Sequence, residues 1–470
     1  MTRSTERLAF AVVDLGFGDA GKGLLVDYLV RDCQATTVVR FNGGAQAGHN
    51  VVTADGRHHT FSQFGAATFL PEVSTLLSRD VLVHPTALLA EARALEKHGV
   101  RDPLSRVRIS EAARVITPFH QALNRIRECA LGASRHGSCG VGVGETVDHS
   151  IRRPGDALLM GRLSDMPAAR RKLSRIQDHA LAEVQALGRL PLEDPALRAE
   201  LGILRDPSTP DIWLEQLQPL LVKDVVVTEE IFLRSLRESG AIVLEGAQGV
   251  LLDEVHGFYP FNSWSDCTFR RAVSLLSDAG WAGTLRRLGV LRCLPIRHGP
   301  GPFPTETDSV SAAIREPHNR ETRWQGPVRY GWFDAVLGRY ALEALGGVDM
   351  LAITHLDALS RLEQWKLCDA YHLNGSNCLT RLAGLAGSLT PLLEKIEPIW
   401  SAESNPREPR VLERIEAALG VDVSIGSHGP CASDVFRLRG KALAGRWSAF
   451  MRSTGTPASH GRGAGDCSLR

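Results

Sequence analysis

Residues 7–23 read RLAFAVVDLGFGDAGKG, and this stretch decides the fold of the chain. Residues 7–15 form an almost continuous apolar run, which is typical of a strand buried on both faces of a sheet. A glycine-rich turn follows from Gly16 to Gly23, and residues 24–30 then have helical spacing. A strand, a Gly-x-x-x-x-Gly-Lys turn and a helix in this order predict a nucleotide site that resembles a P-loop.

The turn has the parts needed to hold a phosphate, with one departure from the usual pattern. Glycines let backbone N–H groups turn toward an anion, the helix N-terminus adds positive potential, and Lys22 supplies a cation. A P-loop places Ser or Thr after the lysine to ligate Mg²⁺, whereas Gly23 has no side-chain oxygen. Asp19, inside the turn, is therefore the predicted metal ligand. A purely structural glycine-rich turn is the alternative.

A second loop of small residues, GGAQAGHN at residues 43–50, follows a short predicted strand at residues 37–41. Small residues would let the imidazole of His49 approach phosphate oxygens closely. Histidine is well suited to donate a proton to such an oxygen near neutral pH. Ligands of open α/β sheets bind at the carboxyl ends of strands, so we expect both loops to face one ligand.

The remaining pattern alternates strands with helices. Further buried strands are predicted at residues 107–110, 241–244, 287–295 and 350–354, and helices at residues 85–97, 118–130, 168–187 and 333–344. This alternation predicts an α/β fold with a large, mostly parallel central sheet and helices on both faces. We expect one domain over residues 1–451, with a helical insertion at 165–225 and a disordered tail at 452–470.

Composition argues against several classes of function. The 54 Lys and Arg residues balance 53 Asp and Glu residues, so there is no bulk electrostatic reason to bind nucleic acid or membrane. No apolar run is long enough to span a bilayer, and the first residues lack a signal-peptide pattern. The nine cysteines contain no Cys-x-x-Cys pair and are predicted to be reduced thiols. We therefore expect a cytoplasmic protein.

Seven blocks of the sequence resemble those of adenylosuccinate synthetases and occur in the same order. They are GFGDAGKG (16–23), GGAQAGH (43–49), GSCGVGVGE (137–145), LEGAQGVLLDEVHGFYPFNS (244–263), RHGPGPFPTE (297–306), GWFD (331–334) and THLD (354–357). The resemblance runs from about residue 8 to 434. Variants within the blocks are similar to a divergent branch, and also resemble the phage enzymes that make 2-aminoadenylosuccinate.

The resemblance implies a ligase that forms adenylosuccinate from IMP and L-aspartate, with GTP as co-substrate and Mg²⁺. In that family an aspartate removes the N1 proton of the purine while the 6-oxygen attacks the γ-phosphate of GTP, and the amine then displaces phosphate. Asp19 would be the base and a Mg²⁺ ligand, and the Gly48 carbonyl a second ligand. His49 would be the acid, and Gln248 would hydrogen-bond the ring and position Asp19.

Further residues carry over by position. The resemblance places GTP against Gly18, Ala20, Gly21, Lys22, Gly23, Gly48, His49, Asn50, His355, Asp357, Ser427 and Gly429. It places IMP against Asp19, Lys22, Gln46, Ser138, Cys139, Arg153, Gln248, Leu252 and Ser263. Cys139 and Ser263 replace two threonines of the family's phosphate site. Arg153 matches an arginine that reaches the other subunit's site, which implies a homodimer, although an exposed surface arginine is the alternative.

The resemblance weakens at the amino-acid loop. Thr322, Arg323, Gln325 and Arg329 are the residues predicted to hold the amino donor. Two central arginines of the family are replaced here by Gly326 and Val328, so glutamate or another amine stays open beside aspartate. Trp324 could be a packing aromatic. His355 replaces a lysine that packs on guanine, which leaves ATP as an alternative, whereas Asp357 favours GTP.

Three rival functions follow from these departures. A synthetase acting on (d)GMP would make 2-aminoadenylosuccinate, but the phage enzymes replace the loop aspartate with a smaller residue, so Asp19 favours IMP. A ligase of specialised metabolism would use a different amine or ATP. A non-catalytic nucleotide-binding regulator would be expected to lose catalytic groups, yet Asp19, Lys22, His49 and Gln248 are all present.

Overall fold

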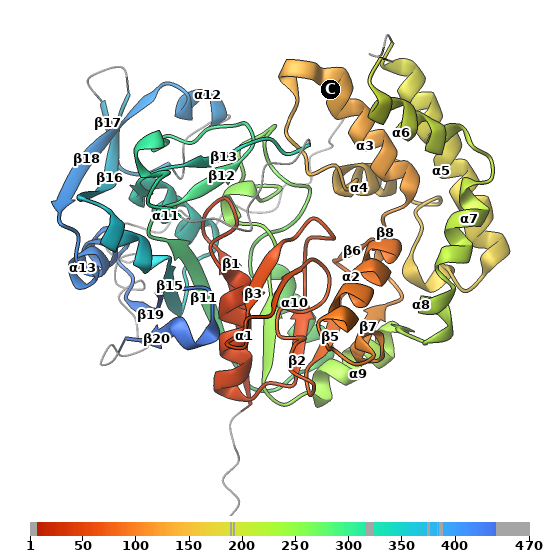
Figure 1. Ribbon diagram of the computed structural model, residues 1–470, viewed down its shortest axis with the longest axis horizontal. Helices are drawn as coiled ribbons and strands as arrows, with labels where there is room; N and C mark the ends of the chain where they lie inside the picture. Colours follow the sequence, from red (N-terminus) through yellow and green to blue (C-terminus); the bar gives the residue numbers. More distant parts are fainter. Residues whose placement is uncertain are drawn as a thin grey trace, which may run out of the picture.

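The computed structural model describes residues 7–188, 190, 193–314, 324–373, 377–382, 384 and 389–438, so the predicted tail at 452–470 lies outside the described residues. A ten-stranded sheet forms the centre of the molecule (Figure 1), in the order β20-β19-β15-β11-β1-β10-β2-β5-β7-β9. Its strands are β1 (Leu8–Asp14), β2 (Thr37–Arg40), β5 (Ser74–Leu77), β7 (Val107–Ser110), β9 (Val226–Val227), β10 (Ile242–Glu245), β11 (Thr284–Arg292), β15 (Met350–Thr354), β19 (Val423–Ser427) and β20 (Val435–Arg437). All neighbouring strands are parallel except β19 and β20. The predicted α/β fold is confirmed.

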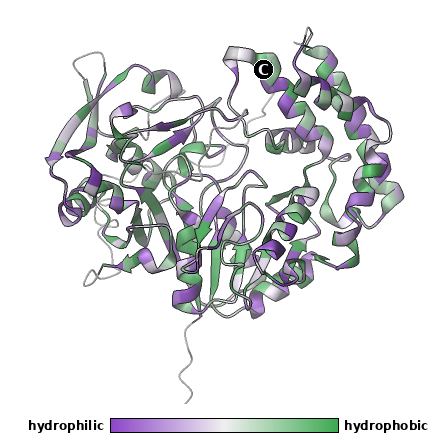
Figure 2. Cartoon of the chain, viewed as in Figure 1, coloured by the Kyte–Doolittle hydropathy of each residue, from purple (hydrophilic) through white to green (hydrophobic). Residues whose placement is uncertain are grey.

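Both faces of the sheet are buried, as the continuous apolar run of β1 predicted. Phe10 and Val12 join one hydrophobic core, and Ala9, Ala11 and Val13 join the other. Side chains alternate between the faces of a strand, so a strand covered on both sides needs apolar residues at every position. The central strands β1, β10 and β15 are accordingly apolar except at their last residues, with helices on each side of the sheet (Figure 2).

Helices cover the two faces in separate groups. The core containing Phe10 is covered by α1 (Lys22–Cys33), α2 (Pro85–Lys97), α3 (Pro118–Leu131), α5 (Met166–Ala186), α6 (Pro195–Arg205), α7 (Thr209–Gln216) and α8 (Gln218–Val222), with α4 (Val143–Arg152) packed beside α3. The core containing Ala9 is covered by α9 (Glu229–Glu238), α10 (Arg270–Ala279), α11 (Ala335–Ala344), α12 (Thr390–Leu393) and α13 (Glu408–Leu419). None of the helices in the described residues is long and apolar enough to cross a membrane.

Four smaller sheets surround the central one. They are β3 (His49–Val52) with β4 (His58–Phe61), β6 (Leu82–Val83) with β8 (Arg114–Val115), β12 (Ile296–His298) with β13 (Val328–Tyr330), and β14 (Phe333–Asp334) and β16 (Gln364–Leu373) with β17 (Asn377–Leu379) and β18 (Ile396–Ser404). The prediction that a helix begins at Phe333 was wrong by two residues. Asp334 instead caps α11 by accepting the Leu337 N–H at 3.0 Å.

The parallel sheet brings the predicted loops to one edge. The neighbouring strands β2, β10, β1, β11, β15 and β19 all end there, and each is followed by a segment that carries candidate functional residues. Since parallel strands have their carboxyl ends on the same side, residues far apart in the sequence meet at this edge.

Candidate active site

The loop between β1 and α1 is organised by the carboxylate of Asp14. This side chain accepts hydrogen bonds from the N–H groups of Gly16 (2.8 Å) and Ala20 (2.9 Å) and from the Lys22 ammonium (3.1 Å). Asp14 and Lys22 are both buried, so each compensates the other's charge. In the part of the chain that the structure describes, no side chain caps the N-terminus of α1. The first N–H groups of the helix are therefore available to a phosphate.

The second loop packs directly on the start of α1. A Cβ atom on Gly23 would lie 2.8 Å from the Asn50 carbonyl oxygen and 2.9 Å from the His49 carbonyl carbon. A serine or threonine after the lysine therefore has no room, which explains the departure from the P-loop pattern. The side-chain oxygen of Asn50 bonds to His58 (3.1 Å) and Thr60 (2.6 Å), across β3 and β4.

His49 is held by a buried carboxylate that the sequence did not single out. Its Nδ1 bonds to Glu245 at the end of β10, and the other carboxylate oxygen accepts the Ala66 N–H at 3.0 Å. Only 5% of His49 is exposed, and burial lowers its pKa to about 4 against the opposing effect of Glu245. Burial acts to raise the pKa of Glu245, but Arg40 and His49 together hold it below its ordinary value. Glu245 is therefore ionised and fixes Nδ1 as the donor.

The acid role predicted for His49 consequently depends on a bound anion. With a pKa of about 4 the imidazole is neutral at neutral pH, and a neutral ring protonated at Nδ1 has no proton on Nε2. A phosphate oxygen beside Nε2 would favour the protonated ring and raise the pKa. We therefore expect His49 to become a proton donor only beside a phosphate.

Three loops interlock through their backbones. A Cβ atom on Gly249 would lie 2.2 Å from the Gly16 oxygen and 2.6 Å from the Gly18 nitrogen. A Cβ atom on Gly43 would lie 2.4 Å from the Cβ of Ala247. The loops after β1, β2 and β10 thus form one continuous floor at the edge of the sheet.

Two glutamine side chains on this floor have unused polar atoms. The side-chain oxygens of Gln46 and Gln248 are buried and, among the described residues, have no hydrogen-bond partner. Gln248 also has a φ of 55°, a left-handed conformation that is unfavourable for glutamine. Buried polar atoms are nearly always satisfied in folded proteins, so these oxygens are suited to accept N–H groups from a ligand. The predicted contact of both residues with one ligand fits this arrangement.

Asp19 pairs with a histidine from the ribbon formed by β12 and β13. Its Oδ2 lies 3.1 Å from Nε2 of His298, and 30% of the Asp19 side chain is exposed. Burial acts to raise the pKa of Asp19, but His298, followed by Lys22 and Arg292, holds it below the ordinary value. Arg292 also donates to the Asp19 carbonyl at 3.0 Å. The carboxylate is therefore ionised at neutral pH and can act as a base or bind a cation.

A magnesium ion is compatible with these residues. In the described ranges, no three His, Cys, Asp or Glu side chains gather to form a metal site. Magnesium does not need such a cage, because one or two carboxylates, phosphate oxygens and water usually complete its octahedral shell. The ionised and partly exposed Asp19 carboxylate is suited to this, and the exposed Gly48 can contribute only its carbonyl. This ligand pair stays a prediction.

The residues predicted to contact the GTP base lie at the ends of β15 and β19. Thr354 donates to the Ala20 carbonyl at 2.9 Å, which joins β15 to the phosphate loop. His355 bonds to the Thr354 hydroxyl at 2.9 Å, and burial holds its pKa well below the ordinary value. Asp357 pairs with Arg361 at 2.8 Å and keeps about a third of its side chain exposed.

Ser427 and Gly429 lie on the adjacent strand end. Ser427 is the last residue of β19 and is buried, and a Cβ atom on Gly429 would lie 2.5 Å from an Asp434 carboxylate oxygen. Because β19 is the neighbour of β15, these residues and the Asp357 segment share one side of the floor.

The residues predicted to bind the IMP phosphate lie in two segments. A Cβ atom on Gly144 would lie 3.1 Å from the Trp264 ring, so the end of the first segment packs against the residue that follows Ser263 in the second. Ser138 donates to Asn124 at 3.1 Å, and burial raises the pKa of Cys139 to about 11, so the thiol stays protonated. In the second segment, the Ser263 N–H donates to the Leu252 carbonyl at 2.7 Å.

Arg153 contacts its own chain. It follows α4, 34% of its side chain is exposed, and its Nη1 lies 3.6 Å from Glu183 of α5. A pair at this distance and exposure contributes little to stability. The predicted reach of Arg153 into a second subunit therefore stays a prediction.

Arg329, predicted to hold the amino donor, contacts a turn of its own chain. Its Nη1 donates to the carbonyls of Gly299 (3.2 Å) and Gly301 (2.8 Å), and its Nη2 donates to Gly301 (2.9 Å). Its Nε lies 3.2 Å from Glu306. The guanidinium thus contacts the 299–301 turn, and its predicted pairing with the carboxylate of the amino donor stays a prediction.

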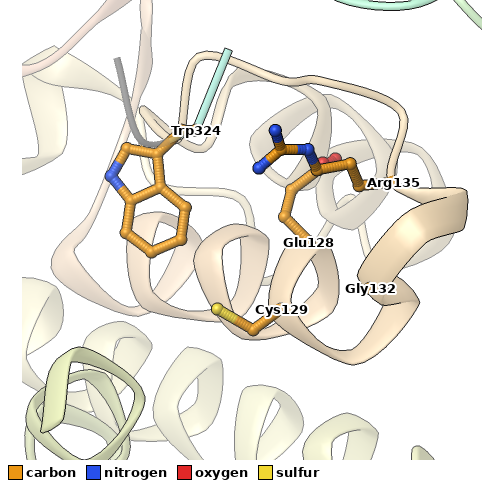
Figure 3. Close-up of a pocket in the computed structure, with 5 residues that line it drawn as sticks. All are labelled: Glu128, Cys129, Gly132, Arg135 and Trp324. Carbon is orange, nitrogen blue, oxygen red and sulfur yellow. The ribbon is translucent and has the colours of Figure 1, made fainter. Parts of the chain in front are cut away.

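The rest of the predicted donor loop borders a small pocket. Thr322 and Arg323 lie outside the described residues. The Gln325 carbonyl packs on Gly299, where a Cβ atom would lie 2.6 Å from it, and Trp324 packs on Gly140. Trp324 also lines a pocket of about 150 Å³ together with Glu128, Cys129, Gly132 and Arg135 (Figure 3). The tryptophan thus packs against the protein and also forms a wall of this pocket.

Comparisons of the sequence identify its relatives. The family profile described as adenylosuccinate synthetase matches residues 11–436. An adenylosuccinate synthetase of Legionella pneumophila (strain Paris) is 34% identical over 450 residues, which cover 92% of this chain and 99% of the relative. One of Pseudomonas fluorescens (strain SBW25) is 34% identical over 444 residues, which cover 91% of this chain and 98% of the relative.

Two solved structures share the fold. Fully ligated adenylosuccinate synthetase from Plasmodium falciparum superposes with a TM-score of 0.75 at 22% identity, covering 92% of this chain and 99% of that one. The succinoaminodeoxyadenylate synthetase of cyanophage S-2L, bound to dGMP and dATP, has a TM-score of 0.58 at 19% identity, with coverage of 92% and 95%. At these identities the likeness concerns the fold.

Proposed function

Because this chain belongs to the adenylosuccinate synthetase family, a family of carbon–nitrogen ligases, we propose that it joins L-aspartate to IMP and converts GTP to GDP and phosphate. The observation that carries the proposal is the ionised Asp19 carboxylate in the phosphate loop, interlocked with the loop that carries Gln248. A base at this position can reach both a purine ring edge and a nucleotide phosphate.

The first step activates the 6-oxo group. Asp19 takes the proton from N1 of the purine, and the electrons of that bond move toward the 6-oxygen, which attacks the γ-phosphorus of GTP as GDP leaves. The unpartnered side-chain oxygens of Gln248 and Gln46 are available to accept hydrogen bonds from hydroxyl groups of the nucleotide, and the amide NH₂ group of Gln248 can donate to an acceptor nitrogen of the ring. Lys22 and the N-terminus of α1 stabilise the charge of the phosphates.

The second step forms the carbon–nitrogen bond. The amino group of aspartate attacks C6, phosphate leaves with the former 6-oxygen, and the amine nitrogen loses one proton to the departing phosphate. N1 of the product carries no hydrogen, and the proton taken up by Asp19 in the first step passes to solvent. His49, held through Nδ1 by Glu245, faces the phosphoryl group with Nε2 and can protonate it. Bound Mg²⁺ would neutralise phosphate charge, and Asp19 with the Gly48 carbonyl are the residues that would hold it.

Finer assignments belong to the same proposal. Asp357, partly exposed at the end of β15, can accept the N–H groups of guanine, which supports GTP over ATP. The chain is proposed to act as a cytoplasmic homodimer in which Arg153 exchanges its contact with Glu183 for the partner's nucleotide phosphate. The amino donor is proposed to be aspartate, although Arg329 is engaged with backbone carbonyls.

The test measures phosphate release by the purified protein with IMP, L-aspartate and Mg²⁺, comparing GTP with ATP, and identifies the product by mass spectrometry. Adenylosuccinate formed with GTP is the expected result. Parallel reactions with dGMP, and with glutamate in place of aspartate, identify the rival substrates. If no combination of 6-oxopurine nucleotide, amine and nucleoside triphosphate releases phosphate, the ligase proposal is wrong.

A further inference from the structure

We propose that His298 is a positioning residue for this reaction, whose Nε2–H holds one oxygen of the Asp19 carboxylate and leaves the other directed at the purine N1–H. The inference rests on the proposed function, because it gives a task to the base of that reaction. It concerns orientation: a base transfers a proton efficiently only when its oxygen is within hydrogen-bond reach and correctly aligned.

The contact between the two side chains is direct. Nε2 of His298 lies 3.1 Å from Oδ2 of Asp19, and the His298 side chain is only 13% exposed. A carboxylate has about four acceptor positions, so one hydrogen bond to Oδ2 leaves room for a ring N–H and a cation. Without such a contact, the Asp19 side chain could rotate about its χ angles away from the ring.

His298 is itself fixed to the loop that carries Asp19. It pairs in register with Val328 across the ribbon of β12 and β13. The preceding residue, Arg297, donates to the Pro302 carbonyl at 2.6 Å and places its guanidinium 4.3 Å from the ring centre of Phe17, which belongs to the phosphate loop. The strand that carries His298 is therefore attached to the same loop as the base it contacts.

The second ring nitrogen of His298 supports a role toward a ligand. Nδ1 is buried and, within the described part of the chain, has no hydrogen-bond partner. A histidine kept only for packing would be expected to satisfy both nitrogens within the protein. When Nε2 carries the proton, Nδ1 is an acceptor that a ligand N–H or O–H group can satisfy.

The experiment compares wild type with His298→Ala and His298→Gln, in which the glutamine amide can still donate to Asp19. His372→Ala, at an exposed position of β16, is the matched control. Two rates are measured: full turnover, and positional isotope exchange in GTP labelled at the β–γ bridging oxygen, with IMP but without the amino donor. The exchange reports the first step, because the label moves when the phosphoryl group is transferred reversibly.

We expect His298→Ala to lower kcat and the exchange rate together, by roughly 10- to 100-fold as for other residues that orient a catalytic group, with the KM for GTP changed less than about 3-fold. His298→Gln should recover most of both rates, and His372→Ala should match wild type. An inactive wild type would reject the proposed function, and this inference with it. An active wild type with unchanged rates in His298→Ala, equal losses in both His298 variants, or a loss of turnover without a loss of exchange would reject the inference alone.

Discussion

Asp19 combines a stable negative charge with a position that a ligand can reach. Its lowered pKa follows from His298, Lys22 and Arg292, which together outweigh the effect of burial. Asp19→Asn keeps the shape of the side chain and removes the base, so we predict a loss of kcat of at least about 10³-fold. Binding of GTP, measured by calorimetry, should largely survive because the loop backbone and Lys22 are unchanged. Turnover near the wild-type rate would remove Asp19 from the mechanism.

His49 and Glu245 form a hydrogen-bonded pair, and each residue can be tested separately. His49→Ala should abolish measurable turnover. Glu245→Gln should lower kcat by roughly 10- to 100-fold, because the ionised carboxylate no longer fixes Nδ1 as the donor and no longer stabilises the protonated ring beside a phosphate. Steady-state kinetics and nucleotide binding measured side by side provide the check. A Glu245→Gln enzyme that turns over normally would show that the buried carboxylate has only a structural role.

At the scale of elements, the start of α1 can pack on β3 because Gly23 has no side chain. Gly23→Ala would place a Cβ atom 2.8 Å from the Asn50 carbonyl oxygen, so backbone must move. We predict a loss of unfolding free energy of about 1–3 kcal/mol together with a large loss of turnover, since the shift displaces His49. Thermal unfolding and phosphate release are the measurements.

The matched control is Gly202→Ala in α6, where a new Cβ atom would meet no other atom within 4 Å. Alanine favours a helix over glycine, so this variant should be unchanged or stabilised by up to about 1 kcal/mol, with normal activity. Equal destabilisation of the two variants would contradict the explanation given for Gly23.

Elements defined by local pattern were predictable, and elements defined by distant partners were not. The strand at residues 107–110 and the helix at residues 85–97 are confirmed with the same bounds, because apolar periodicity and a proline at the helix start mark them. The antiparallel pairing of β16 with β18 was not predicted. Its register joins Trp365 to Glu403, and nothing in either segment alone specifies that partner.

At the scale of the whole molecule, buried neutral histidines predict acid sensitivity. Burial lowers the pKa of His49 and of His84 to about 4, and that of His120 to about 3. In the unfolded chain these rings have a pKa of about 6.5, so between about pH 6.5 and 4 the unfolded state binds protons that the folded state does not. The free energy of unfolding should therefore decrease as the pH is lowered through this window, by up to about 1.4 kcal/mol per pH unit for each histidine.

Denaturant titrations across that pH range measure the slope. His120→Gln should make it shallower, whereas His372→Gln, at an exposed position, should leave it unchanged. A stability that does not vary between about pH 6.5 and 4 would contradict the lowered pKa values, because it would show that the folded and unfolded states bind the same number of protons in this range.

The same distinction between local and distant information applies to the site. Asp19, Lys22 and His49 were found because each lies in a short glycine-rich loop beside a strand. Glu245 and His298 were not among the predicted candidates, because the contacts that distinguish them are made across the sheet edge and not with neighbours in sequence. A charged residue closing an apolar strand is the signal that could have identified Glu245, and also Asp14.

The close backbone contacts at Gly23, Gly43 and Gly249 also restrict how this enzyme could be redesigned. Loops that lack space for a single methyl group cannot absorb insertions or randomised positions without losing their shape. The side chains around Trp324 tolerate substitution better, because they border a pocket of about 150 Å³. The closely packed backbone at these three glycines would have to stay unchanged in every variant that folds.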